Sequence, residues 1–323
     1  MSSFDPRLAQ FDPEIGQSIA AEESRQRNTL GLIASENHTH PEVLATSVSV
    51  LTDNYAEGYP GKRYYAGQEH YDRIENIAIE RAKSVFRAEH ANVQPLSGSP
   101  MNQAVYIGLL KPGDTILAMD LPHGGHLTHV SPLSHMGKVF RFVRYTTSGS
   151  RGDTDTNAVR ALARKHRPKL ILCGHSSYPR EFDYAAFEHI CDEAGAISMA
   201  DVSHIGGLIA GGGVPQNPLD AGFDLMTTTT GMTGAEAQAR LEAAGIVCDK
   251  QLVPDDVLPP MRTSGMRLGT PAATVRGMKQ PEMKRAASLI DRVMRASATG
   301  RASEAVVDEV RKLVHAYPVP TLN

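Results

Sequence analysis

Residues 170–201, LILCGHSSYPREFDYAAFEHICDEAGAISMAD, contain the pattern that decides the fold. Leu170 to Gly174 and Ala196 to Asp201 are short apolar runs, and Tyr184 to Ala194 between them has apolar residues at helical spacing. A strand, a helix and a second strand in this order are typical of parallel strands joined by a crossover helix. The stretch therefore predicts an α/β fold.

The same alternation continues on both sides of this stretch. Active sites in such sheets gather at the carboxyl ends of the strands, and the faces of the sheet are covered by helices. We therefore predict a mostly parallel sheet. Its further strands are Thr115 to Asp120, Val139 to Tyr145 and Asp224 to Thr230; the helices are Glu14 to Asn28, Pro41 to Thr52, Tyr71 to Phe86, Met101 to Leu110 and Thr156 to His166; the loops are Asn54 to Tyr65 and Gly206 to Gly213.

The composition changes after Thr230, which indicates a second unit. At about 150 residues per domain, 323 residues correspond to roughly two domains. We predict an N-terminal helical arm over 1–52, a large domain over 53–230 and a smaller C-terminal α+β domain over 231–323. The smaller domain contains helices at Gly234 to Ala244, Met283 to Ala296 and Ser303 to His315, and a strand followed by a Pro-rich turn over Val247 to Leu258.

Composition and charge exclude several classes of protein. Lys plus Arg is 33 and Asp plus Glu is 36, and the formal net charge of −3 gives no footprint for a general nucleic-acid binder. The chain has 3 cysteines far apart, which argues against a disulfide framework and suits a reducing cytoplasm. No 18-residue apolar run predicts a transmembrane helix, and residues 1–13 do not look like a signal peptide. We expect a cytoplasmic protein with no nucleic-acid or membrane partner.

Two motifs are consistent with binding sites for an anion and for a cofactor ring. Residues 96–100, LSGSP, precede a helix, where hydroxyls and backbone N–H groups can hold an anion or simply cap the helix. Asp201 ends a predicted strand, with His204 three residues later. A carboxylate there can hold a protonated pyridine nitrogen, although by itself the residue pattern favours an aspartate that caps the next turn.

Three further motifs leave alternatives open. His123, His126 and His129 could bind a metal, but their setting fits a surface on which a ring stacks better. Arg267, in the turn-rich segment 263–271, suits a substrate carboxylate or is an ordinary surface arginine. The basic and aromatic segment 58–65 could contact nucleic acid or line a small-molecule pocket.

Taken together and in order, several segments resemble serine hydroxymethyltransferase. The resemblance extends from about residue 12 to residue 318. It rests on five long segments: LIASEN at 32–37, NYAEGYPGKRYY at 54–65, ANVQP at 91–95, MDL at 119–121 followed by HGGH at 123–126, and TSGMRLGTP at 263–271. That family has the pyridoxal-phosphate (PLP) type I aminotransferase fold and interconverts serine and glycine, passing the one-carbon unit to tetrahydrofolate. The resemblance implies PLP as cofactor, tetrahydrofolate as co-substrate, and a dimer.

Matched positions imply roles for individual residues. Ser97, Gly98 and Ser99 would hold the cofactor phosphate, completed by Tyr55 from the other subunit. His126 would stack on the ring, Asp201 would pair with the ring nitrogen, and His204 and Ser176 would support the cofactor. Ser35, Tyr65 and Arg267 would bind the amino acid. Glu57 would transfer protons and contact folate, Thr229 belongs to the catalytic threonine run, and the folate pocket would also include Tyr64, Tyr65, Leu121, Gly125, Leu127 and Gln251.

One departure from the family pattern concerns covalent attachment of the cofactor. In the family a threonine run leads into His-Lys, and that lysine binds PLP covalently; here Thr230 is followed by Gly231-Met232. The next lysine is Lys250, which matches a different family position, and the intervening family segment, including an inner strand, is missing. We therefore predict an incomplete sheet and no covalent link at the usual position. The alternative to the family activity is a catalytically inactive or truncated relative that pairs with a full-length homologue.

Overall fold

The computed structural model describes residues 6–130, 134–149, 152–214, 216–228, 241–251, 253–256, 265–295 and 304–320. The chain forms two compact units. Unit 1 comprises Met1–Asn54, Gly231–Gln251 and Leu258–Asn323, and unit 2 comprises Tyr55–Thr230 and Leu252–Val257. Helix α3 (Pro41–Ser47) and the N-terminal helices therefore belong with the C-terminal region.

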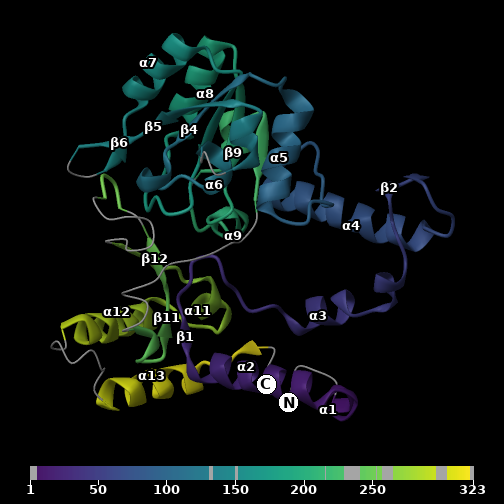
Figure 1. Ribbon diagram of the computed structural model, residues 1–323, viewed down its shortest axis with the longest axis vertical. Helices are drawn as coiled ribbons and strands as arrows, with labels where there is room; N and C mark the ends of the chain where they lie inside the picture. Colours follow the sequence, from purple (N-terminus) through teal and green to yellow (C-terminus); the bar gives the residue numbers. More distant parts are fainter. Residues whose placement is uncertain are drawn as a thin grey trace. The chain divides into compact units, whose positions relative to one another are not determined.

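Unit 2 is built on a five-stranded sheet in the order β10-β9-β8-β4-β5 (Figure 1). All four pairings within this sheet are parallel. The predicted α/β class with a mostly parallel sheet is confirmed. The strands are β4 (Thr115–Met119), β5 (Arg141–Tyr145), β8 (Leu170–Gly174), β9 (Ile197–Asp201) and β10 (Leu225–Thr227).

Each face of this sheet packs into a separate core. On β4, Leu117 and Met119 join the core that contains residues of α7 (Thr156–His166) and α8 (Tyr184–Ala194). Ile116 and Ala118 join the other core, with residues of α5 (Gly98–Leu109). Because side chains alternate along a strand, the two helix layers cover opposite faces, as Figure 1 shows.

The helices α7 and α8 begin and end where the sequence predicts. Asp155 caps α7 by accepting hydrogen bonds from the N–H groups of Asn157 and Ala158, and Asp183 caps α8 through Ala186. Gly195 ends α8 in the left-handed region, with φ 61°. The caps satisfy backbone groups that a helix terminus otherwise leaves unpaired.

Three predictions of local structure are wrong. The predicted loop Gly206 to Gly213 begins with a short helix, α9 (Gly206–Ala210). Glycine is required at its start because a Cβ on Gly206 would lie 2.3 Å from Thr228 Oγ1. The predicted helix over 41–52 breaks after α3, where Ser49 caps a separate 3₁₀ turn (Val50–Asp53). The predicted loop over 54–65 contains a short hairpin, β2 (Gly58–Tyr59) and β3 (Lys62–Arg63).

This hairpin is anchored to α4 (Glu69–Phe86) by Arg63. The Arg63 guanidinium donates to Asp72 at 2.7 Å and to Glu75 at 2.6 Å, and also to the carbonyls of Ala56 and Gly58. Its side chain is only 4% exposed. The anchor fixes the segment that carries Tyr55, Glu57, Tyr64 and Tyr65, since a guanidinium has five donors in a rigid fork.

The remaining elements of unit 2 are short. Helix α6 (Leu127–Val130) follows the 3₁₀ turn Leu121–His123, and β6 (Thr147–Ser148) pairs antiparallel with β7 (Asp153–Thr154). Among the residues that the structure covers, no helix combines the length and the apolar character needed to cross a lipid bilayer.

Unit 1 has a helical core with two small strand pairs. β1 (Leu30–Gly31) pairs parallel with β11 (Ile246–Val247), and β12 (Asp249–Gln251) pairs antiparallel with β13 (Gly265–Arg267). The core includes apolar residues of α12 and α13, both close to their predicted bounds, and residues around β1 and β11. The helices are α1 (Pro6–Phe11), α2 (Pro13–Asn28), α3, α11 (Pro271–Val275), α12 (Gln280–Arg295) and α13 (Glu304–Ala316). The first part of the predicted helix Gly234 to Ala244, residues 234–240, lies outside the described residues.

Candidate active site

The carboxyl ends of three adjacent strands in unit 2 bring polar residues together. β9 ends at Asp201, β10 ends at Thr227, and β8 ends at Gly174, which is followed by His175 and Ser176. A Cβ on Gly174 would lie 2.8 Å from the Asp201 Cβ, so a side chain at 174 would displace the aspartate. Glycine at this position allows β8 to approach Asp201 closely.

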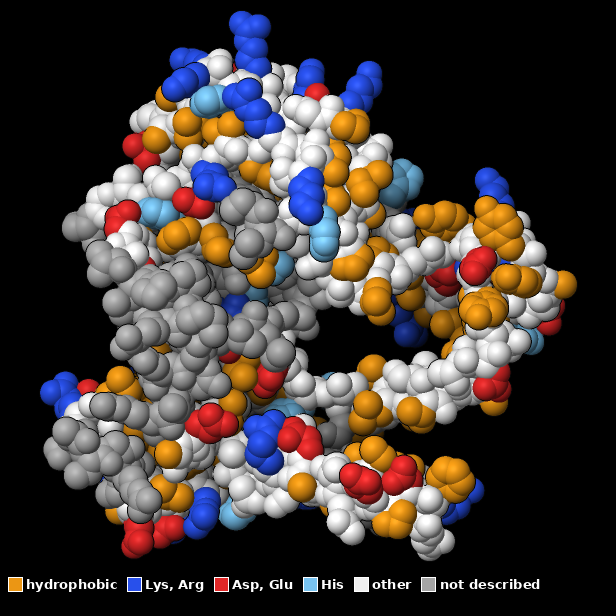
Figure 2. Space-filling model, viewed as in Figure 1, with side chains coloured by type: hydrophobic (Ala, Val, Ile, Leu, Met, Phe, Trp, Pro, Cys, Tyr) orange, Lys and Arg blue, Asp and Glu red, His pale blue; other side chains and the backbone are white. Residues whose placement is uncertain are grey.

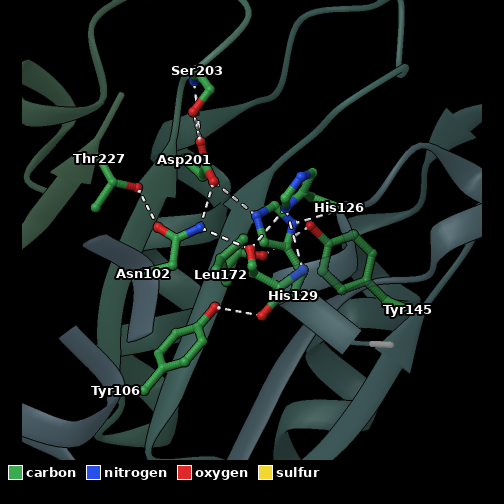
Figure 3. Close-up of polar contacts among 10 residues, drawn as sticks. Asn102, Tyr106, His126, His129, Tyr145, Leu172, Asp201, Ser203 and Thr227 are labelled. Atoms are coloured by element: carbon green, nitrogen blue, oxygen red, sulfur yellow. Dashed lines mark hydrogen bonds and ion pairs between the residues drawn. The ribbon is translucent and has the colours of Figure 1, made fainter. Parts of the chain in front are cut away.

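Asp201 is at the centre of a buried polar network (Figure 3). It is 5% exposed. Its Oδ2 accepts hydrogen bonds from Asn102 Nδ2 at 2.8 Å and His129 Nε2 at 2.9 Å, and its Oδ1 accepts from the Ser203 hydroxyl at 2.6 Å and the Ser203 N–H at 3.1 Å. Four donors therefore converge on one carboxylate.

These hydrogen bonds keep Asp201 ionised. Burial alone raises the pKa of this carboxyl, but the hydrogen bonds from His129, Ser203 and Asn102 outweigh that effect and hold its pKa well below the usual range. The site therefore presents a permanent negative charge at neutral pH inside the protein. Such a charge favours a protonated nitrogen of a bound ring.

The orientation of the two histidines follows from their hydrogen bonds. The His126 N–H donates to His129 Nδ1 at 3.2 Å, so a neutral His129 carries its proton on Nε2, which faces Asp201. The Thr128 N–H likewise donates to His126 Nδ1 at 3.2 Å, and the Thr128 hydroxyl lies 2.8 Å from the same atom. The start of α6 therefore fixes both imidazole rings.

Asn102 links its own helix α5 to three other elements of unit 2, α6, β9 and β10. Its Nδ2 donates to Thr128 Oγ1 at 3.1 Å as well as to Asp201, and its Oδ1 accepts from Thr227 Oγ1 at 3.0 Å. Tyr106 lies one turn further along α5 and donates to the Thr128 carbonyl at 3.3 Å. Figure 3 shows the Asn102 side chain pointing toward both Asp201 and Thr227.

Sequence reasoning did not find the partners of Asp201. Asn102 and Tyr106 are four residues apart on α5 and therefore lie on the same face of the helix. This spacing is the one sequence signal that could have pointed to them. His129 was considered only as part of a histidine cluster. Its pairing with Asp201 spans 72 residues and depends on how α6 packs against the sheet.

His175 is a buried histidine beside this network. It is 8% exposed and packs against the rings of Phe182, at 5.6 Å between centroids, and Tyr178, at 6.0 Å. Burial, followed by the neighbouring His204 and opposed by Asp201, lowers the pKa of His175 to about 4. The imidazole is therefore neutral at pH 7.

We predict that His175 makes unit 2 lose stability in mild acid. Because the unfolded chain binds this proton near pH 6.5 and the folded chain only near pH 4, stability is lost as pH falls through that window, by up to about 3 kcal/mol. His175→Gln should flatten the urea-unfolding free energy between pH 6.5 and 4, relative to the matched exposed control His189→Gln. An unchanged slope in His175→Gln would contradict this assignment.

The predicted phosphate segment lies at the start of α5. Ser97 is the N-cap residue, yet its side chain makes no capping hydrogen bond, and Gly98 and Ser99 are in the first turn. The first N–H groups of a helix have no partner within it, so they are available to an anion. Both serine hydroxyls and these N–H groups are the donor types that a phosphate needs.

The other predicted residues of unit 2 differ in exposure. Ser176 is half-buried, and its N–H donates to the Gly124 carbonyl at 2.6 Å. Gly125 is buried against the Met119 carbonyl, which is 2.1 Å from where a Cβ would lie. His204, His126 and Leu121 are half-buried, Leu127, Tyr55, Glu57, Tyr64 and Tyr65 are exposed, and Thr229 lies outside the described residues.

Tyr55 and Tyr65 come together on the segment that Arg63 anchors. Their rings stack at 6.0 Å between centroids. The Tyr64 N–H donates to the Glu57 carbonyl at 3.1 Å. This segment thus holds four of the predicted site residues in one compact loop.

The predicted amino-acid site residues Ser35 and Arg267 lie together in unit 1. Arg267 is 6% exposed and donates to Ser35 Oγ at 3.3 Å. It is therefore not an ordinary surface arginine. The same guanidinium pairs with Asp249, which sequence reasoning did not single out. Gln251 lies on the same strand as Asp249, paired with Gly265.

The histidines at 123, 126 and 129 have separate partners. His123 Nδ1 lies 2.8 Å from Thr147 Oγ1, whereas His126 contacts Thr128 and His129 contacts Asp201. Within the described ranges, no three His, Cys, Asp or Glu side chains are arranged to hold a metal ion.

The hydrogen-bonding groups of unit 2 match the chemistry of PLP. The buried ionised Asp201 suits the protonated ring nitrogen, and the start of α5 offers hydroxyl and N–H donors for the phosphate. The sequence offers no lysine for a covalent link near the threonine run, because no lysine occurs between Lys169 and Lys250. The residues therefore fit the ring and the phosphate but not the covalent attachment.

A parallel sheet covered on both faces, with an ionised carboxylate at the ends of its strands, is the arrangement of an α/β cofactor-binding protein. A family model described as serine hydroxymethyltransferase matches residues 8–232 and 224–290. The chain belongs to the serine hydroxymethyltransferase family, a family of PLP-dependent proteins with the type I fold.

Three relatives that bear this name show the extent of the similarity. The protein from Desulforapulum autotrophicum is 39% identical over 402 residues, with 95% of this chain and 96% of the relative covered. The protein from Desulfotalea psychrophila is 38% identical over 409 residues, with 98% and 96% covered. The protein from Synechococcus sp. is 56% identical over 226 residues, with 70% and 52% covered. None of these findings favours an inactive relative over the family activity.

The first of these alignments is longer than the part of this chain that it covers. In the Desulforapulum alignment, 95% of 323 residues is about 307, so about 95 of the 402 aligned positions hold no residue of this chain. The two family-model matches overlap at residues 224–232, which contain the end of the threonine run and Gly231-Met232.

Proposed function

We propose that this chain interconverts serine and glycine and passes the one-carbon unit to tetrahydrofolate, with PLP as cofactor. Membership of the serine hydroxymethyltransferase family supports the proposal. The single observation in the structure that carries it is the buried Asp201 carboxylate, kept ionised by His129, Ser203 and Asn102 at the carboxyl ends of the strands.

The residues of unit 2 would hold the cofactor by its two ends. Asp201 would accept a hydrogen bond from the protonated ring nitrogen, and Ser97, Gly98 and Ser99 would donate to the phosphate, with Tyr55 of a second copy completing that site. His126 would stack on the ring, with His204 and Ser176 beside it. When bound, PLP supplies an electron-withdrawing ring that takes up the charge left at the amino-acid α-carbon.

Other residues would bind the substrates. Arg267, Ser35 and Tyr65 would orient the amino acid through its carboxylate. Glu57 would carry a proton to and from the substrate hydroxyl, and Thr229 would assist. The folate would be bound by Glu57, Tyr64, Tyr65, Leu121, Gly125, Leu127 and Gln251.

The cofactor would be held without a covalent link. Met232 occupies the position at which the family has its lysine, so transfer of PLP from a lysine amine to the substrate amine cannot take place there. Retention of PLP would depend on hydrogen bonds and charge alone. Asp201 therefore contributes a larger share of cofactor affinity than it would beside a covalent bond.

We also propose a homodimer. Helix α4 spans 18 residues and none of them is buried, although its sequence is amphipathic. Figure 2 shows hydrophobic side chains over the region of β2 and α4. Exposed apolar surface is often buried in an interface between subunits. The exposed large apolar residues of the hairpin segment and α4 are Tyr55, Tyr59, Tyr64, Tyr65, Ile74, Ile77 and Val85.

A cytoplasmic location is proposed from the cysteines. Cys173, Cys191 and Cys248 are all free thiols and all buried. Free, buried thiols are typical of proteins in a reducing compartment.

The activity is tested by incubating the pure 323-residue chain with PLP, tetrahydrofolate and labelled serine, and measuring labelled glycine. We expect slow glycine formation that requires PLP and is lost in Asp201→Asn. Met232→Lys should raise the rate by restoring an amine where the family has one. If the unsubstituted chain forms no glycine, the activity is refuted for this chain. Co-purification with a full-length homologue would then support the inactive-partner alternative.

A further inference from the structure

The Arg267 guanidinium, which is proposed to receive the amino-acid carboxylate, already forms a buried ion pair with Asp249. Asp249 on β12 and Arg267 on β13 are directly opposite each other in the antiparallel register. Both Nε, at 3.0 Å, and Nη2 of Arg267 donate to the same oxygen, Asp249 Oδ2. The Asp249 side chain is 1% exposed and the Arg267 side chain 6% exposed.

This geometry fixes the plane and the charge of Arg267. A guanidinium has two edges that can bind a carboxylate in bidentate fashion. Asp249 takes the edge formed by Nε and Nη2, and Ser35 Oγ accepts from Nη2 as well, at 3.3 Å. An incoming carboxylate therefore meets a guanidinium that is already oriented and whose positive charge is already balanced.

The surroundings of the pair add further negative charge. Glu36 follows Ser35 in the chain, and its pKa is raised, first by burial and in part by the charge of Asp249. Charges in a site shielded from water interact more strongly than exposed charges. A second carboxylate brought to Arg267 is thus repelled by Asp249 at the same time as it is attracted by the guanidinium.

We infer that Asp249 is a positioning residue for the amino-acid site, which orients Arg267 and cancels its charge, so that the site binds a substrate carboxylate only weakly. This inference rests on the proposed function, since it takes Arg267 as the carboxylate receptor. It assigns to Asp249 a part in setting substrate affinity in addition to any structural part.

The test compares glycine with methylamine, which has the amine but no carboxylate. Their dissociation constants are measured by isothermal titration calorimetry on the full chain with PLP present. In the unsubstituted chain, glycine should be preferred by less than about tenfold, because a neutralised guanidinium offers less than a full charge-assisted hydrogen bond. A preference above about a hundredfold would contradict the inference without any variant.

Asp249→Asn keeps the shape and one acceptor for Arg267 but removes the negative charge. It should tighten glycine binding at least tenfold, about 1.4 kcal/mol, and leave methylamine unchanged. Asp249→Ser carries the same prediction if the asparagine variant folds poorly. Asp291→Asn, which removes an exposed charge on α12, is the matched control and should change neither constant.

Three patterns separate the inference from the function on which it rests. If Arg267→Gln abolishes the preference for glycine and Asp249→Asn strengthens it, both stand. If Arg267→Gln abolishes it while Asp249→Asn leaves it unchanged or weaker, Arg267 remains the receptor and the inference is overturned. If glycine and methylamine bind alike in every variant, including Arg267→Gln, both the inference and the proposed amino-acid site are overturned.

Discussion

Replacing Asp201 with asparagine should lower the affinity of the chain for PLP by at least about a hundredfold, or ~2.7 kcal/mol. Asparagine has nearly the same shape, but a neutral amide cannot stabilise a protonated ring nitrogen. Its NH₂ group would also face either both donors Asn102 Nδ2 and His129 Nε2 or, in the other amide orientation, the Ser203 N–H, so that at least one hydrogen bond is replaced by a donor–donor contact. The affinity is measured by absorbance titration with PLP.

The control for this prediction is another aspartate in unit 2. Asp220 is about half exposed and pairs with Arg87, so Asp220→Asn removes the same charge away from the buried network. This variant should bind PLP like the unsubstituted chain. Equal PLP affinities for Asp201→Asn and Asp220→Asn would remove Asp201 from the cofactor site.

Replacing Arg276 with methionine should destabilise unit 1 by about 3 kcal/mol or more. Arg276 is 5% exposed and donates to the carbonyls of Tyr317 at 2.6 Å, Val314 at 2.7 Å and Thr29 at 2.8 Å. Two of these carbonyls lie in or just after α13, and Thr29 follows α2. A cation at the carboxyl ends of two helices is favourable, and its loss leaves several buried acceptors without a donor.

Urea unfolding of Arg276→Met, followed by circular dichroism, checks this prediction. Arg295→Gln is the matched control, because Arg295 is 79% exposed and pairs with Asp291 four residues earlier; its loss should cost at most about 0.5 kcal/mol. If the two variants unfold at the same urea concentration, the hydrogen bonds of Arg276 make no measurable contribution to the stability of unit 1.

Local sequence patterns predicted the elements that position the site. The bounds of α7 and α8 and the strand Leu170–Gly174 follow from apolar spacing together with capping residues such as Asp155, Asp183 and Gly195. Placing Asp201 at a strand end was enough to make it a candidate, since strand ends in a parallel sheet face a common edge. These features depend on neighbouring residues in the chain.

The partners of the candidate residues could not be predicted in this way. Asp201 and Asn102 are 99 residues apart, and their hydrogen bond exists only because α5 packs against the sheet beside β9 and β10. Asp249 and Arg267 meet because of the register of β12 and β13, which no local pattern specifies. The predicted loop at 206–213 is wrong at its start because Gly206 packs closely against Thr228 in a short helix, whereas a glycine-rich run generally indicates a loop.

The most direct test of the account is the stoichiometry of PLP binding to the unsubstituted 323-residue chain, measured by equilibrium dialysis. The account predicts about one PLP per chain, bound reversibly and removed completely by further dialysis, because Asp201 and the start of α5 hold the cofactor and Met232 stands in place of the lysine. Failure of the folded chain to bind PLP at a single saturable site would contradict it.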